Sequence, residues 1–107
     1  MERQVIFSDD VEAYLDELTI LLFEKGYFVF PENAKAYVAE IVLFMKTNIG
    51  IRPGRVAPPY FEQFGDDLEY IVYHANRRTS WYGFYQQDIN IFAVQLITNN
   101  HMVAQYF

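Results

Sequence analysis

The sequence has 107 residues, which predicts one domain spanning residues 1–107. Hydrophobic residues make up 52% of it and cysteine is absent, so a disordered chain, disulfides, cysteine-ligated metals and thiol nucleophiles are excluded. The net charge of −6 disfavours general binding to duplex nucleic acid, because such binding depends on lysine and arginine neutralising phosphates.

The distribution of charge and hydropathy along the chain bears on its partners and on its location in the cell. Residues 1–50 carry four basic and nine acidic side chains, or −5, whereas residues 51–107 carry four arginines and five acids, or −1. The second half therefore retains arginines that can hold a phosphate locally. No apolar stretch approaches the roughly 20 residues that span a bilayer, and residues 1–4 lack the apolar core of a signal peptide. We expect a cytoplasmic protein with no membrane partner.

The N-terminal region predicts a short strand followed by a helix. Residues 4–7 are a β-prone run, and residues 8–10 offer oxygens for an N-cap. Asp9 with Glu12 three positions later resembles a capping box. Apolar side chains then recur at the i, i+3, i+4, i+7 spacing of one helical face, which predicts a helix over residues 9–25.

A second helix follows after a short connector. Gly26 suits the left-handed position that closes the first helix, and Pro31 suits the first turn of the next. An apolar stripe continues to Ile49, and Gly50 ends it. The five residues 26–30 are a short connection, so the two helices should form an antiparallel hairpin.

Beyond a proline-rich loop at residues 52–59, the hydrophobic period changes to two. Three strands are predicted at residues 68–74, 79–86 and 90–98. Turns at residues 76–78 and 87–88 would join them into a three-stranded antiparallel meander. The fold class is therefore α+β: an N-terminal strand, an antiparallel helical hairpin, then the meander.

The predicted meander is apolar on both faces. Alternation puts Trp81 and Tyr85 on one face and Tyr82 and Phe84 on the other. In the last strand it sets Ile91, Ala93 and Ile97 against Phe92, Val94 and Leu96. One face should pack on the helices, which leaves an aromatic surface for a partner.

Most catalytic signatures are absent, and a small basic set remains. There is no phosphate-binding glycine loop, no nucleophile elbow and no histidine pair with metal-ligand spacing. The side chains that remain are Arg52, Arg55, Arg77, Arg78, His101 and Tyr106. Arginine holds phosphate bidentately and histidine transfers protons near neutral pH, which suits metal-free RNA cleavage by the ribose 2′-OH. Each residue also has a structural interpretation, as a solvated turn, an exposed strand end or a packing aromatic.

The order of elements resembles the RelE/ParE superfamily of toxins from type II toxin–antitoxin systems. The likeness covers nearly the whole chain and rests on residues 5–15, 68–74, 81–86 and 90–101, followed by Gln105-Tyr106. It implies a toxin that cleaves mRNA on the ribosome, as RelE- and HigB-like members do, or poisons gyrase, as ParE-like members do. It also implies an antitoxin that holds the toxin inactive, no cofactor and no metal.

Carried over to this sequence, the resemblance implies roles for named residues. His101, Tyr106 and Arg78 are the predicted catalytic residues, and Arg77 is a predicted RNA-phosphate-binding residue. Arg52 and Arg55 are also predicted to bind RNA phosphate, on the chemistry of arginine and not on the resemblance. His101 would act as general acid or base, and Tyr106 would assist or stack on a base. A cognate antitoxin peptide is expected over the aromatic sheet face of Trp81, Tyr82 and Phe84, with the ribosome and mRNA as further partners.

The sequence also departs from the family pattern. Trp81 stands where RelE-like members carry an arginine early in the middle strand, and Asn99 and Asn100 stand where they carry basic residues. These departures and the net charge of −6 leave two alternatives open beside the ribonuclease. One is a catalytically inactive protein-binding module on the same scaffold, and the other is a gyrase-poisoning toxin.

Overall fold

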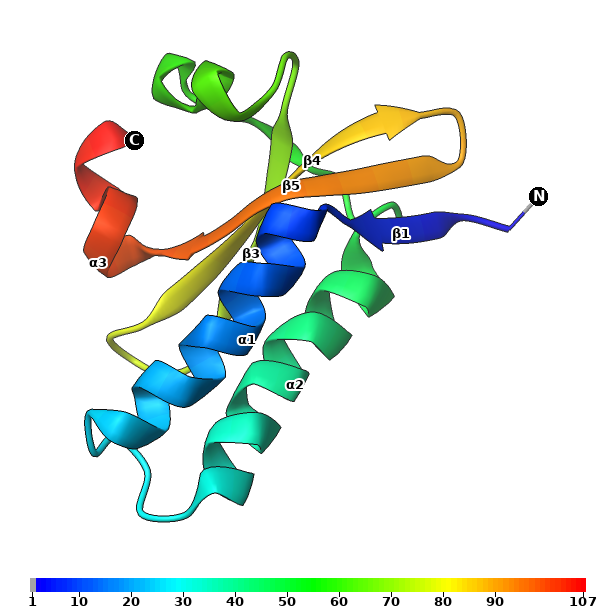
Figure 1. Cartoon of the computed structure of the whole chain (residues 1–107). Helices are drawn as coiled ribbons and strands as arrows, with labels where there is room; N and C mark the ends of the chain where they lie inside the picture. Colours follow the sequence, from blue (N-terminus) through cyan, green and yellow to red (C-terminus); the bar gives the residue numbers. More distant parts are fainter. Residues whose placement is uncertain (1) are drawn as a thin grey trace.

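Two long helices and a five-stranded sheet make up most of the chain (Figure 1). The structure is a computed structural model that describes residues 2–107. Strand β1 (Gln4–Phe7) leads into helix α1 (Asp9–Glu24) and helix α2 (Pro31–Asn48). The later elements are β2 (Arg55–Val56), the 3-10 helix η1 (Pro59–Phe64), β3 (Glu69–His74), β4 (Ser80–Asp88), β5 (Ile91–Asn99), α3 (Asn100–Val103) and the 3-10 helix η2 (Ala104–Tyr106).

The start of α1 is capped by a serine. The Ser8 hydroxyl accepts a hydrogen bond from the Val11 amide at 3.2 Å, which satisfies one of the free amides of the first turn. The predicted pair of Asp9 and Glu12 does not provide this cap, because Ser8 already stands at the N-cap and both acids lie within the first turn. There they favour the positive end of the helix dipole.

The end of α1 confirms the predicted role of Gly26. This residue has a φ of 78°, and its amide bonds to the Phe23 carbonyl at 3.1 Å. The Tyr27 amide bonds to the Leu22 carbonyl at 3.1 Å, which completes a Schellman motif. The chain then returns as α2, so the two helices form the predicted hairpin (Figure 1). Within residues 2–107, neither long helix has the length and apolar content that crossing a bilayer requires.

The sheet confirms the α+β class but is larger than a three-stranded meander. Strands β3, β4 and β5 pair antiparallel in sequence, while β1 joins β5 in parallel and β2 joins β3 antiparallel. The order is β1-β5-β4-β3-β2, a five-stranded mixed sheet. The difference lies in the two edge strands, β1 and β2. Strand β2 has only two residues, too few for a period of two, and β1 pairs with residues distant in the sequence.

The predicted turn at residues 87–88 is wrong by two positions. Gln87 and Asp88 still pair with β5, and the chain reverses at residues 89–90. Ile89 takes a φ of 53° there, a conformation that β-branched residues rarely adopt. The predicted turn residues Gln87 and Asp88 therefore lie within β4, and Ile89, a residue type that disfavours positive φ, forms the turn.

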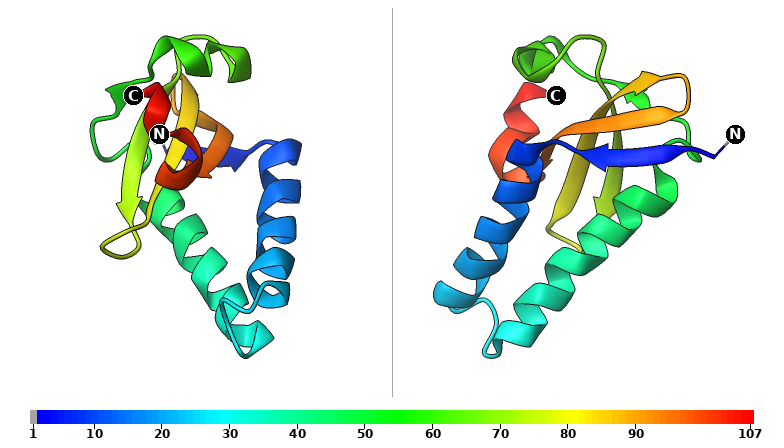
Figure 2. Two further views of the ribbon diagram at one scale, coloured as in Figure 1. Left: turned by 90° about the vertical axis from the view of Figure 1, so that its left-hand side faces the viewer. Right: turned by 45° about the vertical axis from the view of Figure 1, so that its right-hand side comes forward.

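Each face of the sheet carries a hydrophobic core. Helices α1 and α2 lie on one face (Figure 2), where their apolar stripes bury Ile71, Trp81 and Tyr85. On the other face η1 and α3 bury Phe84 beneath Phe61 and Val103. The aromatic face that we expected to be free is therefore largely covered by this chain itself.

A bulge switches the faces of β5. Phe84 pairs with Leu96 and Tyr85 with Val94, so Gln95 is an extra residue in β5. Before it, Val94 faces the helices; after it, Ile97 does. The strict alternation assumed from the sequence fails at this point, because one extra residue moves every later side chain to the opposite face.

Candidate functional site

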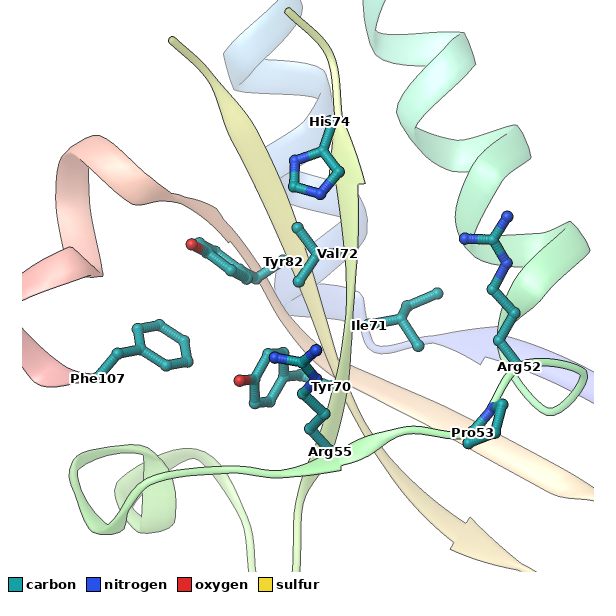
Figure 3. A pocket seen from close by; sticks show the side chains of 9 residues that line it. All are labelled: Arg52, Pro53, Arg55, Tyr70, Ile71, Val72, His74, Tyr82 and Phe107. Carbon is teal, nitrogen blue, oxygen red and sulfur yellow. The ribbon is translucent and has the colours of Figure 1, made fainter. Parts of the chain in front are cut away.

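The face of the sheet away from α1 and α2 has a hollow of about 510 Å³ beside its covered part (Figure 3). Strand β3 forms its floor, the β2 segment one wall and the C-terminal tail another. Nine residues line it: Arg52, Pro53, Arg55, Tyr70, Ile71, Val72, His74, Tyr82 and Phe107. The basic residues among them are two arginines and a histidine, and none of the nine is an aspartate or a glutamate.

Alternation along β3 separates the charges. Tyr70 and His74 point to the hollow (Figure 3). Tyr73 packs on the helix side, and Glu69 accepts from Tyr85 on that same side. Arg55 lies directly opposite Tyr70 across the β2–β3 pair. Glu69 is therefore held on the opposite side of the sheet, the side on which Glu40 of α2 also lies.

Those acids are engaged by tyrosines. The Tyr85 hydroxyl donates to Glu69 Oε1 at 3.4 Å, and the Tyr73 hydroxyl donates to Glu40 Oε2 at 3.1 Å. Burial, and then the Glu69 carboxylate, raises the pKa of Tyr85 to about 12. Burial and the hydrogen bond to Glu40 raise the pKa of Tyr73. Both phenols therefore stay protonated at neutral pH and keep donating to the carboxylates.

The end of α2 positions Arg52. Its amide bonds to the Asn48 carbonyl at 2.9 Å, which continues the last turn of the helix past Gly50. The guanidinium carbon lies 5.4 Å from the centre of the Phe44 ring, within the range of a cation–π contact. Arg52 therefore reaches the hollow from the α2 side and Arg55 from the β2 side (Figure 3).

His74 is the residue of this site that sequence reasoning missed. It stands at the end of β3, exposed, with Nδ1 2.8 Å from Ser80 Oγ across the β3–β4 pair. Because Ser80 occupies Nδ1, Nε2 is the ring nitrogen available to a ligand. The available signal was the alternation of side chains along the strand, which puts His74 on the same face as Tyr70. Two arginines also precede this strand in the sequence.

The predicted residues Arg78 and His101 lie elsewhere, at the corner between the β3–β4 turn and α3. His101 Nε2 is 3.0 Å from Thr79 Oγ1. Asn100 Nδ2 donates to the Arg78 carbonyl at 2.9 Å, and Asn100 Oδ1 accepts from the Ser80 amide at 2.9 Å. These contacts tie α3 to the turn. His101 also lines a separate hollow of about 330 Å³, with Trp81 in its wall.

Arg77 lies in the same turn, where Asn76 Oδ1 accepts from the amides of Arg78 and Thr79. This Asx turn explains the predicted reversal at residues 76–78. Tyr106 is in neither hollow. Its ring stacks on Tyr60 at a centroid distance of 3.5 Å and an angle of 3°. The structure thus does not bring Arg78, His101 and Tyr106 together around one hollow.

The expected antitoxin face is also divided. Trp81 is on the helix side, where its indole N–H donates to the Tyr37 hydroxyl at 2.9 Å. Tyr82 and Phe84 are on the other side, and Phe84 is fully buried under Phe61, with ring centres 4.2 Å apart. Trp81, Tyr82 and Phe84 are therefore not one surface, because neighbouring residues of a strand point to opposite faces.

Comparison with known proteins adds no assignment. No protein-family model, no curated protein and no solved structure matches this chain. Within residues 2–107, no three histidine, aspartate or glutamate side chains are grouped so that they could hold a metal ion. The chemistry of the hollow lined by Arg52, Arg55 and His74 is therefore the main guide to function.

Proposed function

We propose that this chain is the toxin of a type II toxin–antitoxin system and cleaves mRNA on the ribosome without a metal. The observation that carries the proposal is that Arg52, Arg55 and His74 line one hollow that no acid lines, in a chain of net charge −6. The chain order of a first strand, a helical hairpin and three antiparallel strands is the order on which the resemblance to RelE/ParE toxins rests.

The hollow contains the groups that cleavage by the ribose 2′-OH requires. In that reaction the 2′-oxygen forms a bond to the adjacent phosphorus and the bond to the 5′-oxygen breaks. The products are a 2′,3′-cyclic phosphate and a 5′-hydroxyl. His74 would act as the base and take the 2′-OH proton, and the departing 5′-oxygen would take a proton from solvent water. Arg52 and Arg55 would bind the phosphate and stabilise its developing charge.

His74 is assigned the proton transfer in this proposal. Its Nδ1 is engaged by Ser80, which leaves Nε2 for a ligand and orients the ring as a partner does in other acid–base sites. Tyr70 and Tyr82 bring hydroxyl groups to the same hollow, where they can donate to phosphate oxygens. His74 thus replaces the predicted His101, which is occupied with Thr79 at the corner of the sheet.

Induced expression in bacteria tests the proposal directly. We expect the wild-type chain to arrest growth and the translated mRNA to carry cuts in register with codons. His74→Ala and the double variant Arg52→Gln/Arg55→Gln should relieve the arrest, whereas the exposed cation Lys35 on α2 provides a matched control, Lys35→Gln, that should remain toxic. Purified ribosomes programmed with mRNA should yield fragments ending in 2′,3′-cyclic phosphate.

Three results separate this function from its alternatives. Growth arrest with intact mRNA and broken chromosomal DNA would indicate a gyrase poison. Absence of both arrest and cleavage would favour the inactive binding module, which the net charge of −6 also favours. Relief by His101→Ala but not by His74→Ala would return the proton transfer to the corner residue.

A further inference from the structure

Two short helices far apart in the sequence are joined by a pair of stacked tyrosines. Tyr60 of η1 and Tyr106 of η2 have ring centres 3.5 Å apart and are nearly parallel, at 3°. The neighbouring Tyr106 hydroxyl also raises the pKa of Tyr60. Beneath them Phe61 is fully buried against Phe84, so η1 is anchored to the sheet. The stack therefore fixes the tail to an anchored element.

The residue that follows this stack enters the hollow. The Phe107 ring lies 5.0 Å from the Tyr82 ring and 5.2 Å from the Tyr70 ring, centre to centre. It is 49% exposed, so it still presents surface to a ligand. Three aromatic rings thus gather at the tail side of the hollow, and Arg55 lies opposite Tyr70 beside them (Figure 3).

The division of the hollow matches the two parts of a nucleotide. Guanidinium groups bind phosphate, and exposed rings bind the flat face of a base that is not stacked on its neighbours. A duplex does not offer such a base, because its bases are paired and stacked. Arg52 lies on the α2 side of the hollow, Phe107 and Tyr82 lie on the tail side, and Arg55 lies between them beside its pairing partner Tyr70 (Figure 3).

We propose that Phe107 and Tyr82 seat one unstacked base of single-stranded RNA, with the buried Tyr70 ring packed against both, and that the Tyr60–Tyr106 stack holds Phe107 in position. This inference rests on the proposed function and names the substrate feature that the site selects. Tyr60 is in this scheme a positioning residue, since it acts through Tyr106 and does not line the hollow itself.

The test compares two probes that differ in one base. One is a short, fluorescently labelled single-stranded RNA made with 2′-O-methyl riboses, which cannot be cleaved. The other is the same strand with an abasic residue at the central position. We expect the wild-type protein to bind the first more tightly. Phe107→Ala should weaken binding of the base-bearing strand by about 5- to 150-fold, the range for loss of one stacked base, and leave the abasic strand unchanged.

Variants of the tyrosine stack test the positioning role. Tyr60→Ala should resemble Phe107→Ala, whereas Tyr60→Phe keeps a ring for Tyr106 to stack on and should bind like the wild type. Phe30, an exposed ring in the connector between α1 and α2, provides a matched control, Phe30→Ala, with unchanged binding. Thermal unfolding of each variant shows whether the fold is intact, and the abasic strand serves as an internal control for it.

The outcomes separate this inference from the function it rests on. If Phe107→Ala and Tyr60→Ala bind both strands like the wild type while Arg52→Gln/Arg55→Gln loses both, the base seat is refuted and the phosphate site stands. Equal losses for both strands in Phe107→Ala also refute it. If Tyr60→Phe behaves like Tyr60→Ala, the stack is not what positions Phe107. If the wild type binds neither strand, the RNA site itself is wrong.

Discussion

Substituting Gly50 by alanine should destabilise the protein strongly, for two separate reasons. Gly50 has a φ of 85°, a left-handed conformation that costs a residue with a Cβ about 1–2 kcal/mol. In addition, a Cβ at this position would lie 2.7 Å from Cε2 of the buried Phe92 ring. Forcing that ring aside in a packed core costs about 1–3 kcal/mol more. We therefore expect Gly50→Ala to lower the free energy of unfolding by about 2–5 kcal/mol.

Gly26 provides a matched control for the backbone contribution. It has a similar φ of 78°, but a Cβ there would meet nothing within 4 Å. Gly26→Ala should cost only the left-handed conformation, about 1–2 kcal/mol. Urea unfolding followed by circular dichroism measures both variants against the wild type. If Gly50→Ala loses no more stability than Gly26→Ala, the contact with Phe92 does not constrain the end of α2 and the reasoning fails.

Three further predictions concern the sheet. Because the pKa of Tyr85 is raised from 10.0 to about 12, the folded state keeps a proton that the unfolded state loses, so stability should fall as pH rises through that interval. Tyr85→Phe should make this fall shallower, measured as the urea midpoint against pH. Tyr37→Phe removes the acceptor of the Trp81 indole N–H, which should cost about 1–3 kcal/mol in urea unfolding and change the tryptophan fluorescence. Ile89→Asn should raise stability by about 1 kcal/mol, seen as a higher melting temperature, because asparagine tolerates the left-handed φ of 53° and little burial is lost from a side chain 74% exposed.

Local chemistry explains why the helices were predictable. The stripes of α1 and α2, the closing Gly26 and the opening Pro31 act within a few residues, and each lies where the pattern indicated. The capping serine was within the predicted residues 8–10, although the emphasis on Asp9 and Glu12 was wrong. Such signals need no knowledge of distant parts of the chain.

Pairing between distant segments explains what was missed in the sheet. The parallel partner of β1 lies more than eighty positions away, so no local pattern predicts that pairing. The extra residue Gln95 in β5 reverses which side chains face the helices, yet its own sequence is an ordinary strand. The turn at Ile89 was hidden for the opposite reason, since isoleucine is typical of strands and disfavoured where φ is positive.

Two of the three basic residues of the candidate site were predicted from the sequence. Arg52 and Arg55 were selected because arginine suits phosphate, and the structure brings both to one hollow with Tyr70 and Tyr82. His74 was passed over because attention to the C-terminal tail favoured His101. Which of two histidines faces the hollow depends on strand register, which the sequence does not contain.

The local charge of this site differs from the net charge of the chain. The net charge of −6 disfavoured general binding to duplexes, while the arginines of the second half were expected to hold a phosphate locally, and the hollow is lined by two arginines and a histidine and by no acid. Alternation along β3 sends Glu69 to the helix side, where the Tyr85 hydroxyl binds it, and Glu40 of α2 is bound by Tyr73 on the same side. The side chains that line the hollow are therefore basic or neutral, although the chain as a whole is acidic.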